Sequence, residues 1–166
     1  MKSAKVIIIG AGPVGTFAAY CLAEYGIETL VLESESTCET DMRASTFHPS
    51  TLKYLDNLNL ADELIEKGLK APIFQYRIRS TDEVLEFNLQ ELDDVLDFPF
   101  RLQCEQYKFA RMLAGKLDRH RHSSVLFNRK LINYSEGKNK VTLDVDHHGT
   151  SEQYQCDYLI GADGAN

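Results

Sequence analysis

The sequence predicts an α/β fold in which a parallel sheet carries an inserted hairpin and an antiparallel meander. Two apolar runs, at residues 6–9 and 27–32, enclose a helical stretch, and a third strand-like run, at residues 157–160, comes near the far end of the chain. Such runs are typical of parallel strands that are buried on both faces. Glycine-rich loops follow the first and third runs, at the strand ends where open α/β sheets bind ligands.

The first run leads into the turn Gly10, Ala11, Gly12, Pro13, Val14 and Gly15. Glycines at this spacing between a strand and a helix are typical of a Rossmann-like dinucleotide-binding fold. Gly10 allows a tight turn, Gly12 leaves room for a pyrophosphate against bare backbone, and Gly15 lets the helix press on the strand. The amides at the helix N-terminus then face the anion.

The helix stops at Gly26, and the second strand ends directly before Glu33. An acidic residue about 20 positions past the glycines can accept hydrogen bonds from a ribose diol. Because a 2′-phosphate there would be repelled, the site suits FAD or NAD rather than NADP. The alternative is a plain strand, turn and helix with a solvated glutamate, which the coincidence of so many parts of the fingerprint disfavours.

The middle of the chain alternates short helices and strands. Pro49 suits a first helical turn before leucines at helical spacing, and a second short helix is expected at 61–67, closed by Gly68. The further elements expected are a hairpin of strands 73–79 and 84–89, an acidic loop at 91–97, an extended segment at 98–102, a helix from Gln103 to about Leu117, and meander strands at 125–127, 130–134, 141–145 and Tyr154.

Composition disfavours several classes of function. The 166 residues carry a net charge of −7 and no basic run long enough to follow a phosphate backbone, which argues against nucleic acid as a partner. The cysteines form no C-x-x-C pair and no metal-ligand spacing with histidine, so neither a metal site nor a disulfide framework is expected. The apolar runs are too short for a signal peptide or a membrane span. We therefore expect a soluble, cytoplasmic protein with no membrane partner.

Four sequence blocks stand in order along the chain. They are the glycine turn with Glu33, Arg43-Ala44-Ser45-Thr46-Phe47-His48-Pro49, Leu102-Gln103-Cys104-Glu105-Gln106, and Gly161-Ala162-Asp163-Gly164-Ala165-Asn166. Together they resemble the FAD-dependent aromatic-ring monooxygenases of the para-hydroxybenzoate and phenol hydroxylase type. The resemblance covers the whole chain.

The resemblance implies a set of FAD contacts. The turn from Gly10 to Gly15 would hold the pyrophosphate, and Glu33 would lie at the adenosine ribose. Ser34 is also counted among the cofactor-binding residues. The remaining implied contacts are Arg43 at the phosphate and ribityl region, Gln103 at the ribityl hydroxyls, Leu131 at adenine through its backbone, and Asp163 near the flavin phosphate or ribityl groups. Ala44 and Gly164 would be further cofactor-binding residues.

By this resemblance the chain is the N-terminal part of an FAD-binding domain, an incomplete fold in which residues 71–100 begin a sheet on the substrate side. The whole enzyme would hydroxylate a phenolic or aromatic substrate with O₂ and NAD(P)H, the flavin carrying the chemistry. No catalytic side chain is assigned, and homo-oligomer formation is left open. The 166 residues alone are expected to bind FAD weakly or not at all and to lack hydroxylase activity. A bright, stoichiometric flavin spectrum would contradict this.

Three alternatives remain open. A halogenase or a geranylgeranyl-type reductase would share the glycine turn and the Asp-Gly block, although a halogenase is expected to carry a tryptophan-bearing segment and this chain has no Trp. A non-catalytic nucleotide-binding module is the second alternative. The third, a simple NAD-binding domain, is disfavoured by the long mixed insert that follows Glu33.

Overall fold

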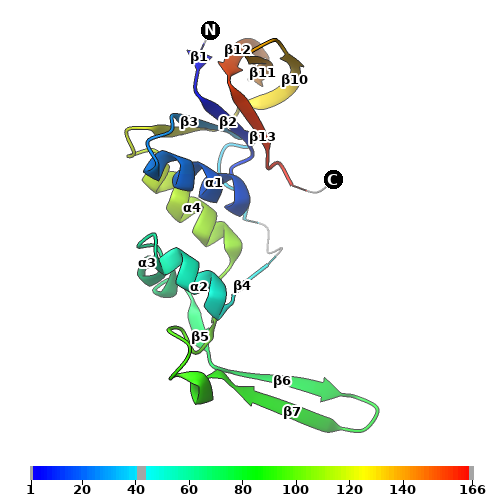
Figure 1. The fold of residues 1–166 in the computed structure, drawn as a ribbon. Helices are drawn as coiled ribbons and strands as arrows, with labels where there is room; N and C mark the ends of the chain where they lie inside the picture. The colour runs from blue at the N-terminus through cyan, green and yellow to red at the C-terminus, as the bar shows by residue number, and fades with distance from the viewer. Residues whose placement is uncertain (1, 41–43, 165–166) are drawn as a thin grey trace. The chain divides into compact units, whose positions relative to one another are not determined.

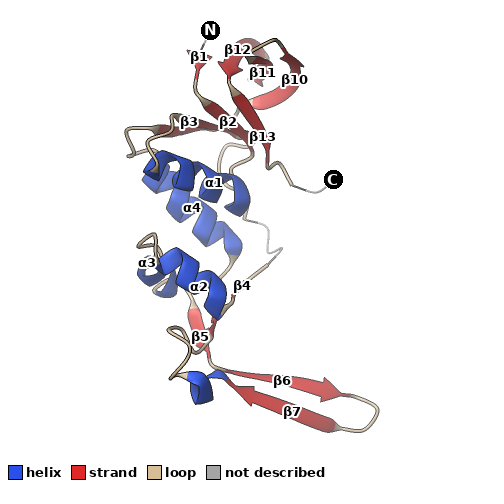
Figure 2. Ribbon diagram, in the orientation of Figure 1, coloured by secondary structure: helices blue, strands red, loops and turns tan. Residues whose placement is uncertain are grey.

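The computed structural model describes residues 2–40 and 44–164, and the chain divides into two compact units. One unit comprises Met1–Asp41 with Phe109–Asn166, and the other comprises Met42–Lys108. Figure 1 labels the elements along the chain, and Figure 2 distinguishes helices from strands. The first unit contains the parallel sheet and the meander, and the second contains the hairpin.

A parallel sheet forms the centre of the first unit. Its strands are, in spatial order, β13 (Tyr158–Gly161), β2 (Val6–Ile9), β3 (Thr29–Leu32) and β9 (Ser123–Leu126). Helix α1 (Pro13–Glu24) connects β2 to β3, and Gly26 adopts a φ of 74° just beyond it, which is the left-handed conformation that ends many helices. The predicted α/β class is confirmed.

The two faces of this sheet bury different partners. On one face the strands pack against α1 and against residues of α4 (Gln106–Leu117), in a cluster of Val6, Ile8, Val31, Val125, Ala19, Ala23, Ala110, Ala114 and Leu117. On the other face Ile7, Leu30 and Leu32 pack against Leu143, Val145 and Tyr154. Neighbouring residues Ile7 and Ile8 face opposite sides, as a strand requires, and both are completely buried. Each such side chain contributes about 1.5–3 kcal/mol.

A second sheet covers the face that Ile7 occupies. Its strands, in spatial order, are β1 (Lys2–Ser3), β12 (Thr150–Cys156), β11 (Val141–His147) and β10 (Lys130–Glu136). β10, β11 and β12 are antiparallel neighbours, so the predicted meander is confirmed, with longer strands than the sequence indicated. The parallel pairing of β1 with β12 was not predicted, because a Lys-Ser pair carries no strand pattern.

The second unit combines two short helices with two small sheets. Its elements are β4 (Thr46–Phe47), α2 (Pro49–Asp56), α3 (Ala61–Ile65), β5 (Leu69–Ala71), β6 (Ile73–Ile78), β7 (Glu83–Asn88), a 3₁₀ helix (Leu89–Leu92) and β8 (Arg101–Gln103). β4, β8 and β5 form one antiparallel sheet, and β6 and β7 form the predicted hairpin. Within the described parts of the chain, no helix has the length and apolar character needed to cross a membrane.

The expectation that Gln103 begins a long helix is wrong. Gln103 is the last residue of β8, where it pairs with Thr46 of β4, and the helix begins at Gln106. The cause is tertiary, because the Cys104 N–H donates to the carbonyl of Ser45 at 2.8 Å and so keeps the chain in the sheet. A local helical pattern carries no information about that partner.

Candidate functional site

Two glycines of the turn after β2 are fixed by close backbone packing. Gly10 has a φ of 103°, and a Cβ built on it would lie 2.5 Å from the carbonyl oxygen of Ala162. A Cβ on Gly15 would lie 2.0 Å from the carbonyl oxygen of Gly10. Cβ contacts below 3.0 Å essentially never occur, so neither position accepts a side chain without movement of the backbone. The structure thus has the tight turn and the close helix packing that the sequence predicts.

Gly12 differs, because open space lies where its side chain would be. A Cβ there would meet no heavy atom of the described residues within 4 Å, and a φ of −72° is open to any residue. Gly12 is also the N-cap of α1, and neither a capping side chain nor an acidic residue of the first turn screens that helix end. Bare backbone at the positive end of a helix is a geometry that receives a phosphate anion.

Glu33 follows β3 with its carboxylate turned toward the glycine turn. Oε2 accepts a hydrogen bond from the Ala11 N–H at 2.6 Å, and Oε1 accepts from Ser34 Oγ at 3.1 Å and from the Glu35 N–H at 3.0 Å. An ionised carboxylate offers about four acceptor positions. These bonds therefore fix its orientation and still leave capacity for another donor, such as a hydroxyl group.

The main chain of Glu33 is held by the end of β9 and by the loop between β9 and β10. Its N–H donates to the carbonyl of Leu126 at 3.0 Å, and its carbonyl accepts from the Arg129 N–H at 2.7 Å. Leu131, to which the family resemblance assigns an adenine contact, lies two residues after Arg129. It packs against the hydrophobic cluster between the parallel sheet and the second sheet. Sequence reasoning missed Arg129, because nothing near it in the chain indicates that it contacts Glu33.

The second glycine-rich loop lies against the first. The Ala162 N–H donates to the carbonyl of Ile9 at 2.8 Å, and the Cα of Asp163 would be 2.9 Å from a Cβ on Gly10. Asp163 and Gly164 are exposed, and Gly164 has a φ of 93°. The fold therefore brings the Asp-Gly block to the glycine turn from the opposite end of the sequence.

The other residues that the sequence assigns to a cofactor belong to the second unit. Thr46 Oγ1 donates to Gln103 Oε1 at 3.0 Å, and the two residues are register partners between β4 and β8. The carbonyl of Ala44 accepts from the Gln106 N–H at 3.1 Å. The second and third sequence blocks are thus joined in one small sheet. Arg43 lies outside the described residues.

A polar cluster at the meander surrounds Glu152. The carboxylate accepts a hydrogen bond from the Tyr154 hydroxyl and lies 3.3 Å from Lys2 Nζ, 3.4 Å from His147 Nδ1 and 3.6 Å from Arg129 Nε. The hydrogen bond from Tyr154, supported by the one from Lys2, lowers the pKa of Glu152 to about 2. The side chain is therefore ionised near neutral pH, although only 21% of it is exposed.

The stability difference between the wild type and Glu152→Gln is expected to depend on pH. A carboxyl whose pKa is lower in the folded than in the unfolded state stabilises the protein above its unfolded pKa. The difference in the free energy of unfolding should have its full value above pH 4.5, and it should shrink as the pH falls toward 2. Urea unfolding midpoints at a series of pH values measure it. A difference that persists unchanged at pH 2 would contradict an ionised cluster.

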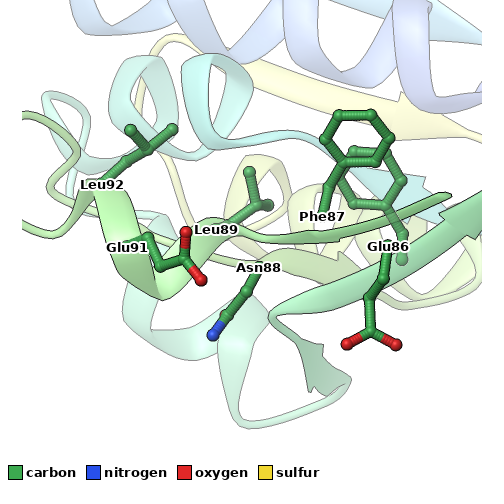
Figure 3. Close-up of a pocket in the computed structure, with 7 residues that line it drawn as sticks. Glu86, Phe87, Asn88, Leu89, Glu91 and Leu92 are labelled. Carbon is green, nitrogen blue, oxygen red and sulfur yellow. The ribbon is translucent and has the colours of Figure 1, made fainter.

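A separate pocket of about 330 Å³ lies at the base of the β6–β7 hairpin, and Figure 3 shows the side chains around it. Its lining residues are Phe74, Glu86, Phe87, Asn88, Leu89, Glu91 and Leu92. Phe74 and Phe87 stack with ring centroids 5.1 Å apart, and the Arg101 guanidinium lies over the Phe74 ring. Figure 3 shows Glu86 pointing away from Phe87, on the opposite face of the strand. That this segment begins a substrate-side sheet stays a prediction.

The site offers binding groups rather than a nucleophile. Burial raises the pKa of the Cys38, Cys104 and Cys156 thiols, so these side chains are neutral near neutral pH. Among residues 2–40 and 44–164, no three His, Cys, Asp or Glu side chains are grouped to hold a metal ion. What the arrangement can do is accept an anion at the start of α1 and a diol at Glu33.

Comparison with known proteins agrees with this geometry. The family model described as FAD binding domain matches residues 3–166. The chain is 32% identical over 162 residues to 6-hydroxy-3-succinoylpyridine 3-monooxygenase HspB of Pseudomonas putida (strain DSM 28022 / S16), in an alignment that covers 98% of this chain and 41% of that relative. The crystal structure of p-nitrophenol 4-monooxygenase PnpA from Pseudomonas putida DLL-E4 superposes with a TM-score of 0.91 at 25% identity, covering 99% of this chain and 42% of that one.

The fold alone does not select the reaction. The structure of CmlS, a flavin-dependent halogenase, also superposes, with a TM-score of 0.79 at 23% identity, covering 99% of this chain and 30% of that one. The chain spans 41% of the length of the relative HspB. The family model, in contrast, extends over nearly every residue of the chain. The chain belongs to the FAD binding domain family.

Proposed function

We propose that the chain is the FAD-binding portion of a flavin-dependent monooxygenase that hydroxylates a phenolic or aromatic substrate with O₂ and NAD(P)H. Membership of the FAD binding domain family and the monooxygenase names of its relatives support the proposal. The observation that carries it is the joint placement of the Glu33 carboxylate and the open backbone at Gly12, both at the N-terminus of α1.

The residues present fit the adenosine diphosphate half of FAD. The pyrophosphate would lie against Gly12, where a backbone without Cβ meets the positive end of a helix. The ribose hydroxyls would donate to Glu33, whose existing hydrogen bonds already set its orientation. The further residues that we assign to FAD, by the family resemblance, are Gly10, Ala11, Pro13, Val14, Gly15, Ser34, Arg43, Ala44, Gln103, Leu131, Asp163 and Gly164.

FAD would supply the redox chemistry, passing electrons from NAD(P)H to O₂ for hydroxylation of an aromatic ring. The part of this chain is to bind and orient the nucleotide. Glu33 selects against a 2′-phosphate at this position by repulsion between two anions. We place the protein in the cytoplasm, because its four cysteines are free thiols.

A nucleotide series tests the cofactor half of the proposal. In equilibrium titrations of a polypeptide that carries this chain together with the region that the relatives have beyond it, ADP and FAD are expected to compete for one site. FMN and riboflavin, which lack the adenosine, should leave ADP in place. Glu33→Gln should weaken ADP binding about 10-fold, because the acceptor of the ribose hydroxyls loses its charge. The matched control is Glu35→Gln, which removes an equal charge from an exposed neighbouring side chain. An equal loss of ADP affinity in Glu33→Gln and Glu35→Gln would rule out the assignment of Glu33 to the ribose. Displacement of ADP by FMN would rule it out as well.

The hydroxylation half requires a polypeptide that carries this chain together with the region that the relatives have beyond it. With isotopically labelled O₂, NADH or NADPH, and a panel of phenols, we expect one labelled oxygen atom in the product. Oxidation of the nicotinamide with no labelled product from any phenol would contradict the hydroxylase and favour another class of FAD enzyme.

A further inference from the structure

We infer that Arg129 and Glu152 form a positioning pair for Glu33, so that discrimination between an adenosine ribose and a 2′-phosphorylated one depends on an ion pair outside the nucleotide site. The inference rests on the proposed function, because it concerns how the proposed ribose contact is held. It adds two residues that lie in neither the glycine turn nor the Asp-Gly block. Three links connect Glu152 to the carboxylate of Glu33.

The first link is a main-chain hydrogen bond. The Arg129 N–H donates to the carbonyl of Glu33 at 2.7 Å, while the N–H of Glu33 is held by Leu126 at 3.0 Å. The side chain of Glu33 extends from this same stretch of backbone to reach the Ala11 N–H at 2.6 Å. A displacement of Arg129 therefore changes where the carboxylate stands relative to the glycine turn.

The second link is the side chain of Arg129. Nη1 donates to the carbonyl of Phe127 at 2.8 Å, and Nε lies 3.6 Å from Glu152 Oε2. The Arg129 and Glu152 side chains are only 17% and 21% exposed, so water screens their attraction less than it would on an open surface. The buried Nε has no hydrogen-bond partner among the described residues, and the carboxylate of Glu152 is a group of opposite charge beside it.

The third link is the fixation of Glu152 itself. Lys2 of β1, His147 of β11 and Tyr154 of β12 all contact the carboxylate, and Tyr154 is completely buried. Glu152 is therefore tied to the second sheet and cannot follow a movement of Arg129. It acts as an anchor that holds the loop between β9 and β10 against the end of β3.

This geometry predicts a specific defect when the anchor is removed. Repulsion between Glu33 and a 2′-phosphate weakens with distance, and so does the hydrogen bond from a ribose hydroxyl. A carboxylate that moves away from the ribose position therefore binds the unphosphorylated nucleotide less well and repels the phosphorylated one less. Both changes lower the ratio of the two affinities.

The test uses a polypeptide that carries this chain together with the region that the relatives have beyond it. It measures the binding of ADP-ribose and of 2′-phospho-ADP-ribose, which differ only in the 2′-phosphate. We expect the wild type to prefer ADP-ribose, and we expect Glu152→Gln and Arg129→Lys each to reduce that preference about fivefold, which is a usual size for coupling between contacting residues. Each nucleotide is titrated separately into the same preparation of a variant. A smaller folded fraction therefore cancels in the ratio of the two affinities. Glu136→Gln, an exposed residue of β10, is the matched control for the change in charge.

The outcomes separate the two proposals. A wild type that discriminates, with two variants that keep the full preference, overturns the positioning role and leaves the ribose contact intact. An equal loss of preference in Glu136→Gln would also overturn it, because a general change in charge would then explain the effect. A wild type that binds neither nucleotide overturns the proposed function and the positioning pair with it.

Discussion

Gly12→Ala is expected to abolish most nucleotide binding while the fold survives. A methyl group at Gly12 meets no described atom within 4 Å, and the backbone conformation there suits any residue. Alanine is a poorer N-cap than glycine, so a loss of up to about 1 kcal/mol is expected. The same methyl group would stand between the proposed pyrophosphate and the backbone amides. Loss of two charge-assisted hydrogen bonds predicts at least about 100-fold weaker ADP binding.

Gly12→Ser separates capping from binding. A serine hydroxyl caps a helix better than alanine does, so the thermal stability should return to that of the wild type. Its Cβ still occupies the space above the backbone, so ADP binding should remain weak. Calorimetric titration and thermal unfolding of the three proteins measure both quantities. Wild-type affinity in Gly12→Ala would contradict the placement of the pyrophosphate.

Gly15→Ala is expected to damage the fold itself. Its Cβ would lie 2.0 Å from the carbonyl oxygen of Gly10, which is a backbone atom and not the flexible end of a side chain. Gly10 cannot easily move, because its N–H donates to the carbonyl of Leu32 at 2.8 Å and the Ala162 carbonyl fills the space where a Cβ would lie. Overpacking of this kind costs typically 1–3 kcal/mol, and a clash with backbone belongs at the upper end, about 3 kcal/mol. The melting temperature should fall by roughly 10 °C.

Gly115→Ala is the matched control for this substitution. Gly115 lies inside α4, and a Cβ there would meet no heavy atom of residues 2–40 and 44–164 within 4 Å. Alanine in a helix interior is more favourable than glycine by about 0.5–1 kcal/mol, so this variant should melt slightly higher than the wild type. If Gly15→Ala melted within about 2 °C of the wild type, α1 would not press on the end of β2 as the structure has it.

The glycine turn could be predicted from sequence because its causes are local. The strand, the turn, the helix and Glu33 follow one another along the chain, and each glycine has a role that its immediate neighbours define. Gly10 and Gly15 show an added constraint, because a Cβ on either would meet Ala162, which comes from the far end of the sequence. The resemblance to a known family identified that second loop as part of the cofactor site. It did not predict that the loop contacts Gly10.

Features that depend on distant partners could not be predicted in this way. Gln103 was expected on a helix because the residues after it have helical spacing, and its strand pairing with Thr46 comes from a segment that the local pattern does not include. Arg129 and Glu152 look like ordinary surface charges in the sequence. Their importance comes from the turn of the chain that brings β12 beside the loop before β10.

The central claim is that the adenosine diphosphate half of FAD lies at Gly12 and Glu33. A ¹⁵N–¹H correlation NMR titration with ADP tests it most directly, because this measurement locates even weak binding residue by residue. The account predicts that the amide signals of the glycine turn, Glu33, Leu131 and Asp163 shift together and saturate, and that these shifts are lost in Gly12→Ala. Saturable shifts confined to the β6–β7 hairpin, with none in the glycine turn or at Glu33, would contradict it.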